Sequence, residues 1–261
     1  MFLAHEPVAR MAPFGAEHIA VLIATVAITA LALAAVRRAR DVKAVERWLA
    51  RAGWALLVVT LLWTAWWMLP AYWHIEESLP LHFTDVLRVV TAVALIAKSG
   101  WAIAVSYFWG LTLNLQAFVS PDLGYHYAPG LEFTMFWVLH IAALVAPIVL
   151  VWGLGYRPTW AGYGTVLALT AGWASVAIAG NAVTGANYGY LSRDPGVPSM
   201  LDLLGPWPVS ILWELVLVLA VWAAMTWPWT TGRRTASAPV ADRLGLVRRH
   251  GDLVTERIRV V

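Results

Sequence analysis

The chain has 261 residues, of which 61% are hydrophobic and only 13% are charged, and its formal net charge is +3. Soluble domains are about 45–50% apolar and about 25% charged, so the composition excludes an ordinary soluble domain and indicates a membrane protein. The absence of cysteine excludes disulfides, thiolate metal sites and cysteine nucleophiles. In such a chain a small positive excess reflects membrane orientation, and no nucleic-acid partner is expected.

Seven apolar segments follow one another along the chain, each close to the roughly 20 residues that a spanning helix needs. They lie at 18–36, 48–70, 81–98, 100–119, 131–153, 160–182 and 207–229. The apolar runs are continuous rather than alternating, which argues against a barrel of strands. The first run ends in arginine and not in a small-residue cleavage site, so we interpret it as a span and not as a signal peptide. The predicted fold class is an all-α membrane protein, a bundle of about seven transmembrane helices.

Lysine and arginine are concentrated on one side of the predicted bundle. The connection "RRARDVKAVER" is strongly basic, and Lys98, Arg157 and the arginines of the C-terminal tail fall on the same side. The other side carries only Arg10 and Arg193, together with several acidic residues. Because basic loops are retained in the cytoplasm, this pattern predicts an outside N-terminus and a cytoplasmic C-terminus, in the cell (plasma) membrane.

Three regions are expected along the chain. Residues 1–17 form an extracytoplasmic N-terminal segment, 18–229 a seven-helix transmembrane domain, and 230–261 a basic cytoplasmic tail. The tail mixes basic and aliphatic residues, so it could lie on the anionic inner leaflet or remain a solvated segment.

Polar side chains gather at the outward ends of the predicted spans. Polar groups inside a membrane are costly, so each calls for a partner or a role. The set comprises His82, Thr84, Asp85, Arg88, Asn114, Gln116, Glu132, His140, Asn181 and Glu214. The simplest explanation is a polar cavity that opens to the outer surface. The outer loops 120–130 and 185–208 are rich in glycine, proline and tyrosine, and the second is long enough to cap such a cavity.

The start of the third span, "LPLHFTDVLRVV", carries the densest polar cluster. His82 and Asp85 are three residues apart, as are Asp85 and Arg88, so helical spacing places them on one face. Asp85 could pair with Arg88, or it could orient His82 and fix its tautomer. A packing network that locks this helix to its neighbours is the alternative to a functional site.

Several motifs occur in the same order as in a known family. "LPLHFTD", "LQAFVSPDL", His140 within the fifth span, and "NYGYL" followed by "LLGPWP" resemble the bacterial YwaF-type integral membrane proteins over roughly residues 15–230. Their superfamily includes a eukaryotic transmembrane acyltransferase that acts on ether phospholipids. The resemblance implies lipid acyl chemistry with a cysteine nucleophile near a membrane-embedded histidine. Many bacterial relatives have His-x-Cys-Asp, whereas this chain has Thr84 at the cysteine position.

The first functional hypothesis is a lipid acyltransferase or lipid ester hydrolase. Thr84 is the candidate nucleophile, His140 the candidate base, and His82 with Asp85 a supporting pair. Asn114, Asn181 or backbone N–H groups could stabilise an oxyanion, and Arg88 or Arg193 could hold a phosphate or carboxylate. The remaining candidate substrate-binding residues are Gln116, Asn187, Tyr188 and Glu214.

The second hypothesis is a non-catalytic membrane subunit or receptor-like protein whose cavity binds a lipid or a partner. Two weaker alternatives use histidine: a metal site drawn from His74, His82, His126 and His140, which lack metal-binding spacing, or haem held by His82 and His140. A transporter lacks support, since no broken midplane helix or internal repeat is evident. No cofactor or metal is expected. The expected partners are membrane lipids, with a protein partner in the membrane or a second copy of the chain as a further option.

Overall fold

A computed structural model describes residues 7–196 and 198–231. Seven helical segments in this part of the chain are long and apolar enough to cross a membrane, which confirms the all-α class and the number of spans. They are Ala16–Arg38, Val42–Met68, Ile75–Ala97, Gly100–Val119, Pro129–Gly153, Trp160–Thr184 and Val209–Thr231. Backbone groups have no water to bond with in a bilayer, and an α-helix satisfies them within one segment.

Four of these spans are single helices: α1 (Ala16–Arg38), α2 (Val42–Met68), α8 (Trp160–Thr184) and α9 (Val209–Thr231). The fifth span is α7 (Pro129–Ile148), which continues into the π-helical turn η3 (Val149–Gly153). Proline 147 lies inside α7 and cannot donate a backbone hydrogen bond, which agrees with the irregular end of this helix.

The third and fourth spans are interrupted, and both interruptions lie at the same end of the bundle. The third consists of α3 (Ile75–Ser78) and α4 (Phe83–Ala97), separated by a stretch that contains Pro80. The fourth consists of α5 (Gly100–Leu111), the 3₁₀ turn η2 (Leu113–Leu115) and α6 (Gln116–Val119). The expected start of the third span near residue 81 is therefore the start of α4, with an additional short helix before it.

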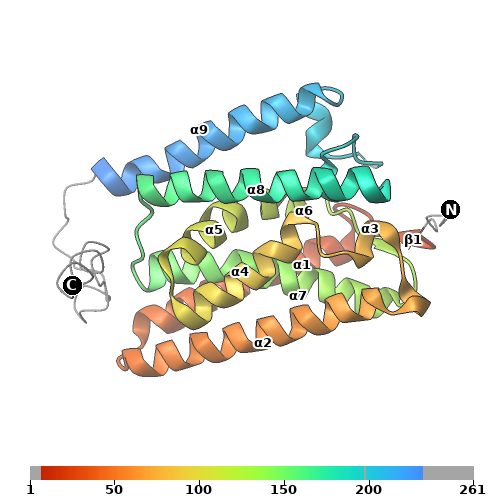
Figure 1. The fold of residues 1–261 in the computed structure, drawn as a ribbon. Helices are drawn as coiled ribbons and strands as arrows, with labels where there is room; N and C mark the ends of the chain where they lie inside the picture. Colours follow the sequence, from red (N-terminus) through yellow and green to blue (C-terminus); the bar gives the residue numbers. More distant parts are fainter. Residues whose placement is uncertain (1–6, 197, 232–261) are drawn as a thin grey trace, which may run out of the picture.

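Helices α4, α5 and α7 form the centre of the bundle, while α1, α2, α8 and α9 lie at the periphery (Figure 1). Two glycines allow the closest approaches. A side chain at Gly53 of α2 would meet the Ala92 carbonyl of α4 at 2.9 Å, and one at Gly110 of α5 would meet the Ala143 carbonyl of α7 at 2.6 Å. Small residues let helix backbones pack closely where lipid supplies no hydrophobic drive for association.

The short elements gather at the end of the bundle where the described chain begins (Figure 1). They are β1 (Ala9–Arg10), η1 (Pro70–Tyr72), α3, α6, β2 (Gly124–Tyr125), η4 (Tyr188–Tyr190) and η5 (Met200–Leu204). Strand β1 pairs antiparallel with β2, so the N-terminal segment is tied to the connection between α6 and α7. We call this the cavity end.

The opposite end carries the basic connections. The turns between α1 and α2, α4 and α5, and α7 and α8 lie there, with their arginines and lysines. The fold thus separates an acidic end from a basic end, as the sequence predicts, although the direction of the bundle across the membrane stays a prediction. The basic tail expected at 230–261 lies outside the described residues from position 232, and so do residues 1–6 of the expected N-terminal segment.

Candidate functional site

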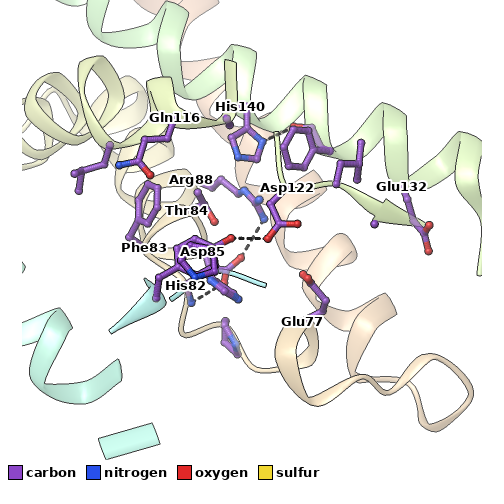
Figure 2. Close-up of a pocket in the computed structure, with 18 of the residues that line it drawn as sticks. Glu77, His82, Phe83, Thr84, Asp85, Arg88, Gln116, Asp122, Glu132 and His140 are labelled. Atoms are coloured by element: carbon purple, nitrogen blue, oxygen red, sulfur yellow. Dashed lines mark hydrogen bonds and ion pairs between the residues drawn. The ribbon is translucent and has the colours of Figure 1, made fainter. Parts of the chain in front are cut away.

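A cavity of about 160 Å³ lies at the cavity end, enclosed by segments from most of the bundle (Figure 2). Its walls come from α2, the α3–α4 region, α6, the connection 120–124, α7 and the segment 190–201. The polar and charged lining residues include Thr64, Glu77, His82, Thr84, Asp85, Arg88, Gln116, Ser120, Asp122, Glu132, His140 and Tyr190. The predicted polar cavity therefore exists at the end where the sequence places it.

The α4 part of the lining begins with His82 as the N-cap residue. Asp85 Oδ2 accepts a hydrogen bond from the His82 backbone N–H at 3.2 Å, while Asp85 Oδ1 accepts one from Arg88 Nη1 at 3.0 Å. The ion pair is the one that helical spacing predicts. An acidic side chain in the first turn also favours the positive end of the helix dipole.

The ring of His82 is held by backbone groups and not by Asp85. Its Nε2 lies 2.8 Å from the Glu76 carbonyl, and the Gly189 N–H points to its Nδ1 at 3.5 Å. A carbonyl can only accept, so Nε2 carries the proton and Nδ1 is left as the acceptor. The structure thus differs from the alternative in which Asp85 fixes the His82 tautomer, because Asp85 is already engaged by the helix N-terminus and by Arg88.

His140 lies deeper, on α7, and is only 5% exposed although it lines the cavity. Its Nδ1 lies 2.6 Å from the carbonyl of Phe136, one turn earlier in the same helix. Because that carbonyl accepts, Nδ1 is the protonated nitrogen and Nε2 keeps its lone pair. The buried Asn114 donates from Nδ2 to the His140 backbone carbonyl at 3.1 Å, which ties α7 to the interruption after α5.

Thr84 lines the same cavity from the first turn of α4 (Figure 2). Most threonine hydroxyls of the spans donate to the carbonyl four residues earlier, as Thr25 and Thr170 do. Within residues 7–196 and 198–231, no hydrogen bond involves the Thr84 hydroxyl. Its position at the helix start explains this, since the residue four positions earlier lies outside α4.

Glu132, which the sequence places among the polar residues of the cavity, lines it, and so do two acidic residues that sequence reasoning did not place there, Glu77 and Asp122 (Figure 2). Glu132 is 1% exposed, and its carboxylate accepts backbone hydrogen bonds from His126 and Tyr127 at 2.9 Å and from Ala128 at 3.3 Å. It is therefore a structural group that fixes the chain entering α7. Sequence signals existed, because Glu132 opens a span and Asp122 belongs to the "SPDL" motif.

Asp122 joins two segments of the cavity end. Its Oδ1 accepts from Arg10 at 2.7 Å, and its Oδ2 accepts from the Tyr190 hydroxyl at 2.8 Å. Burial raises the pKa of Tyr190, and the nearby Asp122 carboxylate raises it further, so the phenol stays protonated and donates.

Six candidate residues from the sequence line the cavity: Thr84, His140, His82, Asp85, Arg88 and Gln116. The other six do not: Asn114, Asn181, Asn187, Tyr188, Arg193 and Glu214. Asn181 bonds both backbone groups of Tyr188, donating to its carbonyl at 3.1 Å and accepting from its N–H at 2.7 Å. Glu214 lies on α9, at the periphery of the bundle.

Arg193, Asn187 and Tyr188, from the same group of six, make contacts that hold the loop 185–208 in place. Arg193 forms a 2.7 Å ion pair with Glu76, while Asn187 accepts from the backbone of Ser192 and Arg193 and donates to the Arg193 carbonyl. The Tyr188 hydroxyl donates to the Ile75 carbonyl. These residues fasten the loop to α3 and α8, which a sequence cannot distinguish from binding a substrate.

The histidines considered for a metal site are divided between two places. The rings of His74 and His126 lie against each other, with centroids 4.4 Å apart, whereas His82 and His140 line the cavity from α4 and α7. In the part of the chain that the structure describes, no group of three or more histidines and carboxylates is arranged to hold a metal ion.

Fold and site together define a multi-pass membrane protein with a polar cavity at one end of its bundle. The chain belongs to the TMEM164 family, whose model matches residues 13–226 and so covers six spans and most of the seventh. No curated protein and no solved structure matches the chain.

Proposed function

We propose that this protein is a membrane enzyme that removes an acyl group from a lipid, either to transfer it to a second lipid or to hydrolyse it. The observation that carries this proposal is the tautomer of His140. The His140 Nδ1–H donates to the Phe136 carbonyl, so Nε2 is available as a base. The Thr84 hydroxyl, which makes no hydrogen bond within the described residues, lines the same cavity. An imidazole base activates a hydroxyl nucleophile when the two come within hydrogen-bond reach, directly or through one water, and Thr84 and His140 line one cavity.

The reaction would take place in two balanced steps. His140 accepts the hydroxyl proton of Thr84, directly or through one water, while the oxygen attacks the acyl carbonyl and the lipid alkoxide leaves with that proton. Water or the hydroxyl of an acceptor lipid then attacks the threonyl ester and gives its proton to His140, which passes it to the leaving Thr84 oxygen. The acyl group departs as a fatty acid or as the ester of the acceptor lipid, and the Thr84 hydroxyl is restored. Gln116 offers an amide donor toward the developing oxyanion, and the paired Arg88 supplies positive charge.

Many of the YwaF-type proteins that the sequence resembles have cysteine at the position of Thr84, and this difference supplies the sharpest test. The chain contains no cysteine, so Thr84→Cys creates a unique thiol. In nanodiscs containing phospholipids with a fluorescent acyl chain, we expect slow turnover by the wild type, none by Thr84→Val, and faster turnover by Thr84→Cys. Thr91→Val is the matched control, because Thr91 is buried on the same helix and bonds Ser106 outside the cavity. Equal turnover by Thr84→Val and the wild type would eliminate the proposed nucleophile.

A second candidate function is lipid binding without chemistry. Two observations favour it: residue 84 is threonine where many of the resembled YwaF-type proteins have cysteine, and the guanidinium of Arg88 is already paired with Asp85. Mass spectrometry of lipid bound to the purified protein separates the two functions. An unmodified lipid retained equally by the wild type and by Thr84→Val and Thr84→Cys variants, without turnover, supports binding; an acylated residue 84 supports catalysis.

The orientation of the cavity follows from the separation of charge. Described basic residues of the opposite end include Arg37, Arg38, Lys98 and Arg157, whereas the cavity end carries Glu76, Glu77, Asp122, Asp194 and Asp202. Because basic ends stay in the cytoplasm, this separation supports the proposal that the cavity of the 18–229 domain opens outward from the plasma membrane. In intact cells, an impermeant maleimide should label Ser192→Cys and not Lys43→Cys; the reverse pattern contradicts this orientation.

A further inference from the structure

The cavity is covered unevenly. Glu77 lines it and is exposed, whereas His140 lines it and is only 5% exposed. The lining around His140 is therefore the less exposed part of the cavity, and the lining around Glu77 is the more exposed part. Figure 2 shows Asp122 between the positions of His140 and Glu77. A bound molecule has to reach this less exposed part of the lining in order to contact His140.

Two segments meet at the cavity, and each contributes a lining residue, Asp122 from one and Tyr190 from the other. One is the connection 120–125, which is anchored by the pairing of β2 with β1 and by the Arg10–Asp122 ion pair. The other is the segment 188–195, which is anchored on α8 through Tyr188 and on α3 through the Arg193–Glu76 ion pair. We call the boundary between these two segments the seam.

Each segment is thus held by hydrogen bonds to the elements on its own side of the seam. Tyr188 is fully buried and makes hydrogen bonds with Asn181 and with the Ile75 carbonyl. On the other side, the Met11 N–H donates to the Leu123 carbonyl at 3.0 Å, and the Val8 N–H donates to the Tyr125 carbonyl at 2.8 Å. Opening is therefore expected at the boundary between the segments and not within either of them.

Within the described residues, a single hydrogen bond crosses the seam: the Tyr190 hydroxyl donates to Asp122 Oδ2 at 2.8 Å. Tyr190 is held in a left-handed backbone conformation with φ 56°, next to Gly189 with φ 66°. Such a conformation is uncommon for a residue with a side chain and directs the ring away from the path of a regular 3₁₀ turn. Burial keeps the Tyr190 phenol protonated by raising its pKa, so the crossing bond persists at physiological pH.

We propose that Tyr190 and Asp122 form the latch of a gate, and that opening the seam admits molecules from the outer face to the part of the cavity around His140. The gate is independent of whether the cavity catalyses or binds, because it concerns only access. Arg10 supports the latch by pairing with the other oxygen of Asp122, which holds that carboxylate oriented toward Tyr190.

The absence of native cysteine allows a direct test of access. Ala117 lines the cavity from α6, and Ala117→Cys provides a single reporter thiol. In nanodiscs, its rate of modification by a charged methanethiosulfonate reagent is compared with that of Ala71→Cys, which is exposed outside the cavity. Removing the latch by Tyr190→Phe or Asp122→Ala should raise the normalised rate about tenfold, since a hydrogen bond to a charged group is lost.

Tyr163→Phe is the matched control, because it removes a phenol that bonds the Leu219 carbonyl at 3.3 Å, away from the cavity. Thermal unfolding of each variant establishes that the fold is retained, and either latch variant suffices if the other does not fold. Labelling at the wild-type rate in a folded latch variant overturns the proposal. So does an equal acceleration by Tyr163→Phe, which would indicate general loosening and not a gate.

Discussion

Asp85 and Arg88 lie one turn apart on α4 and form a 3.0 Å ion pair whose side chains are only 17% and 9% exposed. A guanidinium at this depth depends on its partner, because a charge that is buried without compensation is strongly unfavourable. Asp85 in turn accepts the backbone N–H of His82, so one carboxylate holds both the start of the helix and the charge in the cavity wall.

We therefore expect Asp85→Asn to lower the free energy of unfolding by about 3 kcal/mol. The matched control is Asp41→Asn, since the Asp41–Arg47 pair is 3.7 Å long with side chains 63% and 60% exposed. An exposed pair contributes about 0–1 kcal/mol, so this control should change stability little. Denaturant unfolding in detergent micelles measures both. Equal losses in the free energy of unfolding for the two variants would contradict the expectation that the buried Arg88 needs Asp85 as its partner.

Replacing Glu132 by glutamine should clearly lower the stability of the protein. The carboxylate accepts three backbone hydrogen bonds with its two oxygens, whereas an amide offers one accepting oxygen and introduces donors beside N–H groups. We expect Glu132→Gln to destabilise the protein by about 2 kcal/mol. Glu17→Gln is the control, because Glu17 is exposed at the start of α1. A melting temperature unchanged by Glu132→Gln would show that the connection 126–128 does not need the carboxylate.

The contact of α5 with α7 predicts a steric effect at Gly110. A Cβ there would lie 2.6 Å from the Ala143 carbonyl oxygen, so Gly110→Ala must push the two central helices apart. We expect a loss of about 1–3 kcal/mol in the free energy of unfolding. Gly164 of α8 has nothing within 4 Å of its added Cβ, and Gly164→Ala should instead stabilise its helix slightly. If both substitutions shift the unfolding midpoint in the same direction, the close approach of α5 to α7 at Gly110 does not determine the effect of an added methyl group.

Tyr156 should make stability depend on alkaline pH. Burial raises the pKa of Tyr156 to about 12 from an ordinary value near 10, and its hydroxyl bonds the Gly100 carbonyl at 3.3 Å. The protonated form is favoured in the folded state, so its contribution is complete below pH 10 and is lost as the pH rises from 10 to 12. Tyr156→Phe should thus be less stable than the wild type at pH 8, with a difference that narrows above pH 10. Unfolding midpoints at pH 8, 10 and 11.5 test this, and a constant difference would contradict it.

The site could be predicted from the sequence where its geometry is local. Asp85 and Arg88 belong to one helix, so their spacing alone places them together. His140 and Thr84 were placed at the cavity by the depth of their spans, and both line it. Asn181, Asn187 and Tyr188 lie at the same end of the bundle and are also polar, yet their hydrogen bonds hold the loop 185–208, because the path of a long loop is not encoded in helical periodicity.

The sequence by itself determined the seven spans, the all-α class and the separation of charge between the two ends, because length, apolarity and charge placement are local properties that the bilayer selects. Only the tertiary structure decided which polar groups meet. Asp122 and Tyr190 are 68 positions apart, and they approach because β1 holds one segment and α8 the other. The tautomer of His140 and the covering of the cavity likewise depend on backbone groups brought together by helix packing, and no pattern of residue types records those positions.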